Sequence, residues 1–416
     1  MTTQPPSRCP YRIDEAGTDI HAEAAVLRGL GPAARVVLPG DVQAWSVTDP
    51  GLIRRLLTHP EISKDARQHW PDLINGQIPT DWPLRVWVEV VNALSAYSTE
   101  HTRLRRPLTA AFRPSRIRAL EPQIVHITSQ LLDDLDGIRP GEVVDLRARF
   151  AFQLPLLNVN MLLGVPGNLH DGFRASVGGL FDTSLTAGEA ETAAKDTYQL
   201  LARLVEVKGE QPGDDLTSEL IDEHRNSNLT RQELLDTLML VIGAGHETTV
   251  NLLDHAVTNL LTHPDQLSLV TSGRVAWGQV VEETLRHQAP LASIIMRFPT
   301  RDIEDTATGL VFRRGEPIVI NYAAANRDPL VHGDSSAAFD VARATSGEHL
   351  SFGHGPHYCA GASLALLEAV TALRMLFERY PDLRLAVPAS ELRPLTSFIS
   401  NGHQELPVVL RDPAGR

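Results

Sequence analysis

The chain has 416 residues, of which 43% are hydrophobic and 21% are charged, proportions typical of a globular protein rather than a disordered or fibrous one. Lys and Arg together number 38 against 51 Asp and Glu, which gives a formal net charge of −13 and offers no basic block for nucleic acid. The polar, Pro-rich start does not look like a signal peptide, and no apolar run approaches the ~20 residues that cross a bilayer, so we expect a soluble, cytoplasmic protein without a membrane span.

The predicted elements are mainly helical, with minor β structure. An N-terminal arm, residues 1–15, is polar and Pro-rich, and we expect it to be flexible. Residues 35–49 hold two β-prone runs on either side of Pro39-Gly40, and residues 309–322 repeat this pattern around Gly315, which predicts a small sheet. Leu and Ala recur at helical spacing between them, without a repeat or a long linker. The sequence therefore predicts one mainly α domain over residues 1–416.

The longest predicted helix begins at Thr230, which forms the S/T-x-x-E pattern of a capping box with Glu233, and ends at His263. Its length of about 34 residues corresponds to roughly 50 Å, enough to cross the molecule. Gly243 and Gly245 in its middle each cost about 1 kcal/mol relative to Ala. These glycines indicate either close packing against a neighbouring helix or a helix opened so that Glu247 and Thr248 face a cavity.

The stretch HLSFGHGPHYCAG, residues 349–361, contains one of the two cysteines. The other, Cys9, lies in the N-terminal arm, so no disulfide framework is indicated. The residues after the stretch predict an amphipathic helix, so Cys359 lies at a helix N-terminus, where the dipole and free N–H groups stabilise a thiolate. From these residues alone, Cys359 is an inert buried side chain or the partner of His357 in a nucleophile pair. A zinc site is excluded because there is no second pair of cysteines.

The same stretch matches F-G-x-G-x-H-x-C-x-G, and through this motif and three others in matching order the whole chain resembles the cytochrome P450 family. The resemblance implies the P450 fold, with a long central helix over the haem and small β-sheets. It also implies that the Cys359 thiolate is the metal ligand of the haem iron, where it favours O–O cleavage. We expect haem b, bound noncovalently, because there is no C-x-x-C-H motif. Phe352, His357 and Gly361 are expected to contact the haem.

A second motif, E-x-x-R, consists of Glu283 and Arg286 on a helix that must stop before Pro290. An exposed ion pair at this spacing contributes only ~0.2–0.5 kcal/mol, and this is the usual interpretation of an isolated pair. The resemblance instead adds Arg343 as a third member and implies a structural role, in which the three side chains hold the segment leading into the haem loop.

The third group of residues suits the two haem propionates, which are costly to bury unpaired. His101 and Arg105 are four residues apart and share one helical face, and the family uses this pair for a propionate. By position, Arg297 and His357 match further contacts of the family. Pro107 follows soon after Arg105 and is expected to shorten or kink the helix.

The fourth motif, AGHETT in the long helix, matches the family's pattern of small residues followed by an acid and Thr. Ala244 and Gly245 are the small residues, and Ala244 is expected to line the haem site. Glu247 and Thr248 are the expected catalytic pair, because activation of oxygen needs protons that an acid beside an alcohol can relay through water.

The resemblance implies an O2-dependent monooxygenase that hydroxylates a bulky hydrophobic substrate, which we expect to be a steroid or a polyketide or macrolide. No flavin or nicotinamide domain is visible, so electrons are expected from a separate ferredoxin and ferredoxin reductase. We expect a monomer. The alternatives are a peroxide-driven hydroxylase, a haem-binding sensor or ligand-binding protein without turnover, and a haem-free thiol enzyme.

The expected substrate pocket is apolar, as suits a hydrophobic molecule. Its predicted wall residues come from several segments far apart in the sequence: Val91, Leu94, Phe181, Ala244, Leu291, Ile294, Ile295, Phe398 and Ile399.

Overall fold

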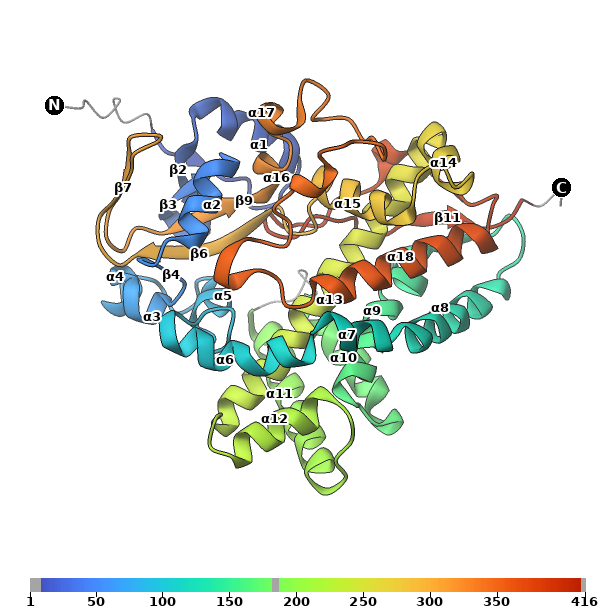
Figure 1. Ribbon diagram of the computed structural model, residues 1–416, viewed down its shortest axis with the longest axis horizontal. Coiled ribbons are helices and arrows are strands. Elements are labelled where there is room, and N and C mark those ends of the chain that lie inside the picture. The colour runs from blue at the N-terminus through green and yellow to red at the C-terminus, as the bar shows by residue number, and fades with distance from the viewer. Residues whose placement is uncertain (1–8, 182–186, 413–416) are drawn as a thin grey trace.

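A computed structural model describes residues 9–181 and 187–412. Most of this chain is helical, and three small sheets accompany the helices, which confirms the expected mainly α class with minor β (Figure 1). Within the described ranges, no helix combines the length and the apolar character needed to span a bilayer. Figure 1 shows the largest sheet beside the N-terminal helices, whereas the helices of residues 170–225 form the opposite edge of the molecule.

The largest sheet has six strands in the order β1-β2-β3-β9-β6-β4, and the other two sheets have three strands, β10-β11-β5, and two strands, β7-β8. The strand bounds are β1 Tyr11–Arg12, β2 Ala33–Leu38, β3 Val42–Val47, β4 Ile62–Ser63, β5 Val143–Asp145, β6 Ser293–Pro299, β7 Ile303–Asp305, β8 Leu310–Phe312, β9 Ile318–Asn321, β10 Arg384–Leu385 and β11 Pro407–Val409.

Both β-prone stretches form strands, but they pair differently. β2 and β3 form an antiparallel hairpin whose turn requires Gly40, at φ 71°. β8 and β9 flank Gly315 without pairing with each other, because β8 pairs with β7 and β9 lies between β3 and β6. Three of the four predicted runs, β2, β3 and β9, therefore lie in one sheet as expected, whereas β8 belongs to the two-stranded sheet.

The longer helices are α1 Ile20–Leu30, α2 Pro50–Thr58, α6 Ser98–Ala111, α8 Glu121–Asp136, α9 Gln153–Leu163, α10 His170–Phe181, α11 Ala187–Glu210, α12 Leu216–Arg225, α13 Arg231–Thr262, α14 Pro264–Thr271, α15 Trp277–His287 and α18 Ala362–Arg379. Shorter helices are α3 Ala66–His69, α4 Pro71–Ile74, α5 Arg85–Glu89, α7 Pro114–Ala119, α16 Tyr322–Ala325 and α17 Pro329–His332, with a π-helical turn η2, Arg147–Ala151, and a 3-10 turn η5, Gly355–His357.

Helix α13 is the central element of the fold, as Figure 1 shows. Thr230 caps it, and the reciprocal bonds between Thr230 and Glu233 complete the predicted capping box. The helix packs against α9, α15, α18 and η2, so side chains on most of its circumference are buried. It continues unbroken through Gly243 and Gly245, and a Cβ atom at Gly245 would lie 3.3 Å from Val159 on α9. Close helix packing, one of the two alternatives, therefore explains Gly245, and the helix is not opened at this point.

Two further expectations are modified by the structure. Residues 11–15 of the N-terminal arm are anchored, because β1 pairs with β2 and the Asp14 carboxylate accepts hydrogen bonds from the N–H groups of Ala16 and Thr18. Residues 1–8 lie outside the described part of the chain. Helix α6 runs past Pro107 to Ala111, so this buried proline does not end the helix.

Candidate functional site

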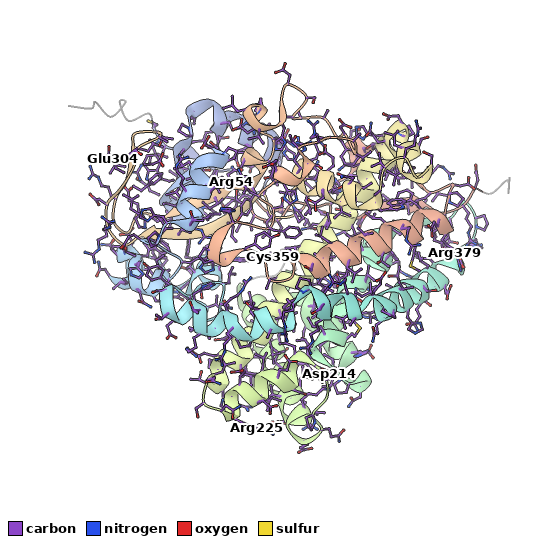
Figure 2. The ribbon with its side chains drawn as sticks, in the orientation of Figure 1. Arg54, Asp214, Arg225, Glu304, Cys359 and Arg379 are labelled. Carbon is purple, nitrogen blue, oxygen red and sulfur yellow. The ribbon has the colours of Figure 1, made fainter. Side chains whose placement is uncertain are left out.

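A cavity lies between α13 and the loop that leads into α18, with α6 and strand β6 at its sides. Figure 2 shows Cys359 near the middle of the molecule, just before α18 begins. The cavity is lined mostly by apolar side chains, with several basic groups. It brings together these residues expected from the sequence: Leu94, Arg105, Ala244, Thr248, Leu291, Ile294, Arg297, Phe352, His357, Cys359 and Gly361.

Cys359 is held by the backbone around it. Its N–H donates to the Phe352 carbonyl oxygen over 2.8 Å, and the backbone N–H groups of Gly361 and Ala362 at the start of α18 point at the sulfur. Burial raises the pKa of the Cys359 thiol, while these N–H groups and the nearby Arg105 guanidinium lower it. The sulfur is accessible, but through the cavity, so a ligand in the cavity can reach it.

Glycines shape this loop. Gly353 and Gly355 have φ of 74° and 72°, values that side chains other than glycine rarely adopt. A Cβ atom at Gly355 would also lie 2.8 Å from the Leu57 carbonyl oxygen at the end of α2. The loop can therefore pack against α2 only with glycine at this position, which accounts for part of the glycine-rich motif.

The basic residues expected from the sequence lie on two walls of the site. His101 and Arg105 come from α6 and face the cysteine loop. The ring centres of His101 and His357 lie 4.1 Å apart, and Arg105 donates to the Tyr358 carbonyl oxygen. Arg297 comes from β6, is 5% exposed, and its Nε has no hydrogen-bond partner within the described residues. Burial lowers the pKa of Arg297, because a buried cation lacks hydration.

The acid and alcohol of α13 have different surroundings. Thr248 lines the cavity, and its hydroxyl donates to the Ala244 carbonyl oxygen over 2.7 Å. Glu247 is buried and does not line the cavity; its Oε1 instead accepts a 2.9 Å hydrogen bond from Arg147 Nη2. Burial raises the pKa of Glu247, and Arg147 opposes that rise. The expectation that Glu247 faces a cavity is therefore wrong for this structure.

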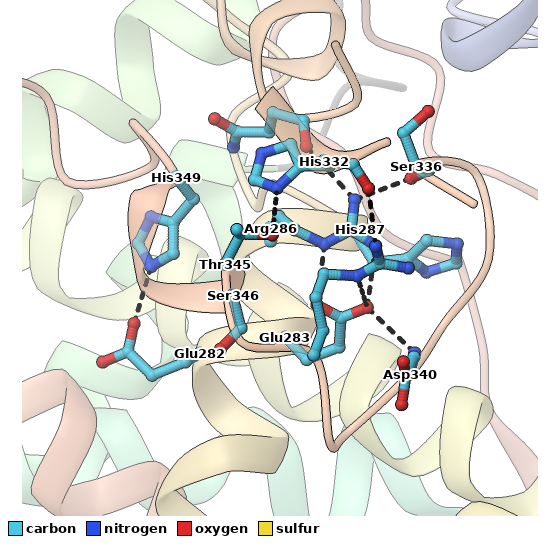
Figure 3. Close-up of polar contacts among 12 residues, drawn as sticks. Glu282, Glu283, Arg286, His287, His332, Ser336, Asp340, Thr345, Ser346 and His349 are labelled. Carbon is cyan, nitrogen blue, oxygen red and sulfur yellow. Dashed lines mark hydrogen bonds and ion pairs between the residues drawn. The ribbon is translucent and has the colours of Figure 1, made fainter. Parts of the chain in front are cut away.

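The E-x-x-R residues form a buried cluster with the segment that precedes the cysteine loop (Figure 3). Arg286 makes two hydrogen bonds of 2.7 Å to Glu283, and Arg343 Nε lies 3.3 Å from Glu283 Oε1. The backbone N–H of Asp340 also donates to Glu283. Because Glu283 and Arg286 are 0% exposed, the alternative of a surface ion pair is wrong.

Several expected pocket residues lie elsewhere. Ile294 lines the cavity, whereas Ile295 points to the opposite side of β6 and packs in the core, as side chains alternate along a strand. Phe398 and Ile399 are buried in that same core, and Val91 does not line the cavity. The side chain of Phe181 lies outside the described part of the structure.

Sequence reasoning missed several residues in and around the site, among them Leu240, Val241, Arg147 and Lys64. Leu240 and Val241 line the cavity one helical turn before Ala244. The 3.6-residue period of α13 places all three residues on the same face of the helix, and this is the signal that could have found them. Arg147, in η2, and Lys64, after β4, carry no recognisable motif. Their proximity to the site depends on how distant segments pack, so the sequence offered no signal for them.

Comparisons with known proteins agree with this geometry. A profile of the family described as cytochrome P450 matches residues 278–387, which include the E-x-x-R helix and the cysteine loop. The 2-hydroxy-5-methyl-1-naphthoate 7-hydroxylase of Streptomyces carzinostaticus is 40% identical over 407 residues, covering 98% of each chain.

Solved structures are similar as well. CYP154A1 from Streptomyces coelicolor A3(2) is 48% identical with a TM-score of 0.90, covering 96% of this chain and 100% of that one. Testosterone-bound CYP154C4 from Streptomyces sp. ATCC 11861 is 38% identical with a TM-score of 0.92, covering 98% of this chain and 100% of that one. The chain therefore belongs to the cytochrome P450 family and is an oxidoreductase, a P450 monooxygenase.

Proposed function

We propose that this protein is a haem-thiolate monooxygenase that hydroxylates a bulky, apolar substrate, with Cys359 as the ligand of the iron. The family implies a haem cofactor, and haem b suits a chain without a covalent attachment motif. When bound, the haem supplies the activation of O2, from which one atom enters a substrate C–H bond and the other leaves as water, with two electrons and two protons consumed. The observation that carries the proposal is a single cavity whose wall contains the Cys359 thiol, the basic side chains of Arg105 and Arg297, and many apolar side chains.

The donor set fits a haem. A thiol at a helix N-terminus suits an iron ligand, because backbone N–H groups stabilise the thiolate. The unpartnered Nε of buried Arg297 suits a propionate carboxylate, as does Arg105 on the other wall. His101 and His357 lie beside Arg105, and burial and the nearby guanidinium groups lower the pKa of both imidazoles, so these rings would serve as N–H donors. These residues would hold the haem, with the apolar side chains around it excluding water.

Thr248 and Glu247 are proposed to deliver the protons. The Thr248 hydroxyl proton is used in the bond to the Ala244 carbonyl, so the Thr248 oxygen remains free to accept a hydrogen bond from a water in the cavity. Burial raises the pKa of Glu247 while Arg147 opposes that rise, and we assign this carboxyl group as the acid of the relay. We propose that Arg147 holds this carboxyl group away from the cavity between deliveries.

The substrate region supports an apolar molecule. Ala93, Leu94, Leu240, Leu291 and Ile294 line the cavity together with Ala244, and none of these side chains carries a polar group. Such a wall recognises shape and apolar area, with orientation set by few polar contacts. A steroid or a polyketide or macrolide meets this description, and one structural relative is recorded with testosterone.

We propose an acidic ferredoxin, reduced by its reductase, as the electron donor. A hollow beside the cysteine loop is lined by Arg105, Arg106 and Arg113 of α6 and the segment after it, together with Pro356. This concentration of cations stands out on a chain whose formal net charge is −13. Complementary charge would steer a small acidic partner to this face, close to Cys359.

The experiment that tests the function combines binding with turnover. Steroids, macrolactones and aromatic acids are titrated into the purified haem protein while the spin-state spectrum is followed. Each compound that shifts the spectrum is then incubated with NAD(P)H, a ferredoxin and its reductase. Hydroxylated product that depends on all three components supports the proposal, whereas product formed with peroxide alone favours the peroxide-driven alternative. A steroid panel without any spectral response removes steroids from the proposed substrate class.

A further inference from the structure

Lys64 is a buried cation in the wall of the cavity. It follows strand β4, is 4% exposed, and lines the cavity together with Arg297 and Cys359. Its Nζ donates to the carbonyl oxygen of Ile295 over 3.1 Å, and within the described residues no carboxylate forms an ion pair with it. A backbone carbonyl leaves the positive charge of the ammonium group uncompensated.

The sheet sets Lys64 beside a second unpaired cation. In the antiparallel pairing of β4 with β6, Ser63 lies opposite Phe298. The next residue of one strand, Lys64, therefore lies opposite the preceding residue of the other, Arg297. Phe298 packs on Trp70 in the core, and the alternation along the strands turns Lys64 and Arg297 to the other side, toward the cavity. Like charges directly opposite each other in a sheet destabilise it.

In the proposed function the Cys359 thiolate is taken up by the iron, so a counter-charge for this pair within the cavity would have to come from a carboxyl group. Glu368 on α18 is the one carboxyl side chain among its described lining residues. Burial raises the pKa of Glu368 well above its usual value, which disfavours the charged form of this carboxyl group as a counter-charge. Burial and the neighbouring Arg297 in turn lower the pKa of Lys64 to about 7. Two buried cations without a carboxylate partner indicate a site that an anionic ligand completes.

We propose that Lys64 and Arg297 form a cross-strand clamp for a carboxylate of the haem, which makes Lys64 a cofactor-binding residue that no sequence motif marks. This inference rests on the proposed function and deepens it. Arg105, on α6, belongs to a different wall from the β4–β6 clamp. The site therefore offers two separate groups of basic residues, one on α6 and one at the β4–β6 pair, and the haem has two carboxylates to place against them.

The clamp makes Lys64 a determinant of haem retention rather than of substrate binding. A charge-assisted hydrogen bond to a buried carboxylate is among the stronger polar contacts in proteins, and its loss should be measurable as faster haem release. Replacing Lys64 by Met keeps the length of the side chain and removes a buried charge, so folding should survive.

The test uses the haem-loaded protein and measures haem transfer to excess apomyoglobin. Lys64→Met should release haem about tenfold faster than the wild type, and Lys64→Arg should retain most of the wild-type stability of the complex. Lys195→Met is the matched control, because Lys195 is exposed on α11, and it should release haem at the wild-type rate. Resonance Raman bands of the propionate groups should shift in Lys64→Met and not in Lys195→Met.

Unchanged release and unchanged propionate bands in Lys64→Met would overturn the clamp. If Lys64→Met does not accumulate, Lys64→Arg tests the same contact, because a guanidinium group in place of an ammonium group must shift the propionate bands; bands identical to those of the wild type would contradict it. A wild-type protein that binds no haem would instead overturn the proposed function, so the two failures are distinguishable.

Discussion

Arg147 Nη2 donates to Glu247 Oε1 across 2.9 Å, in a pair whose two side chains are each 9% exposed. The same guanidinium bonds Asn251 over 3.0 Å and lies 3.7 Å from Asp254, which in turn bonds His403. The acid of the proposed proton relay is thus part of a buried charged network rather than a free group in the cavity. Whether the Glu247 carboxyl group can take part in proton transfer therefore depends on its contact with Arg147.

The first prediction concerns that pair. Arg147→Leu should lower the free energy of unfolding by about 3–5 kcal/mol, because it leaves Glu247 and Asp254 buried without their cation. Adding Glu247→Gln should recover part of this loss, since the neutral amide needs no cation. Urea unfolding of the haem-loaded single and double variants measures the coupling. Strictly additive effects would show that the two residues do not stabilise each other.

The second prediction concerns Thr248. Thr248→Ala should fold and bind haem normally, yet divert electrons from product to hydrogen peroxide, because the hydroxyl that orients water is missing. Thr248→Ser should restore the yield of product per NAD(P)H. Thr262→Ala is the control, since Thr262 makes a similar bond to the carbonyl four residues earlier at the far end of α13. NAD(P)H, peroxide and product are quantified together, and an unchanged ratio in Thr248→Ala contradicts the relay.

The third prediction concerns the buried cluster of Figure 3. Glu283→Ala leaves Arg286 and Arg343 without a carboxylate, a loss of about 3–5 kcal/mol, so little haem-loaded protein should accumulate. Glu282→Ala is the matched control on the same helix, because the Glu282 side chain is 32% exposed and bonds His349 alone. Haem content per polypeptide is the measurement. Equal haem content in both variants would show that the cluster does not support the cysteine loop.

The fourth prediction is a pH dependence of haem retention. Without a haem carboxylate, the pKa of Lys64 is about 7, lowered by burial and by Arg297, with His357 also nearby; the unfolded value is ~10.4. Between these values the unfolded chain binds a proton that the cofactor-free fold does not, so the stability of that fold rises with pH. A haem carboxylate favours charged Lys64, so haem binding should weaken as the pH rises above 7.

Haem release measured from pH 7 to about pH 9 checks this sign. Release from the wild type should accelerate over this range more than release from Lys64→Met, which has no proton to lose at this position. Parallel pH profiles for the two proteins would contradict the involvement of Lys64.

Local sequence signals predicted the elements and the cysteine loop, but not the neighbours across the fold. The capping box at Thr230 and the glycines at 353 and 355 act over a few residues, so the sequence reveals them. Glu247 was expected to face a cavity because Gly243 and Gly245 suggested an opened helix, and nothing in its own segment points to Arg147, 100 residues earlier. Ile295 and Phe398 were misplaced for a related reason: hydrophobicity predicts burial, but not whether the side chain faces the core or the cavity.

The central claim is that the Cys359 thiolate binds the haem iron, and the spectrum of the reduced protein with carbon monoxide tests it most directly. The wild type should give the strongly red-shifted Soret band of thiolate ligation, and Cys359→Ser should lose that band, whereas Cys9→Ser should keep it, because Cys9 is the other free and exposed cysteine. A Cys359→Ser protein that retained the red-shifted band, or a haem-loaded wild type without it, would contradict the assignment.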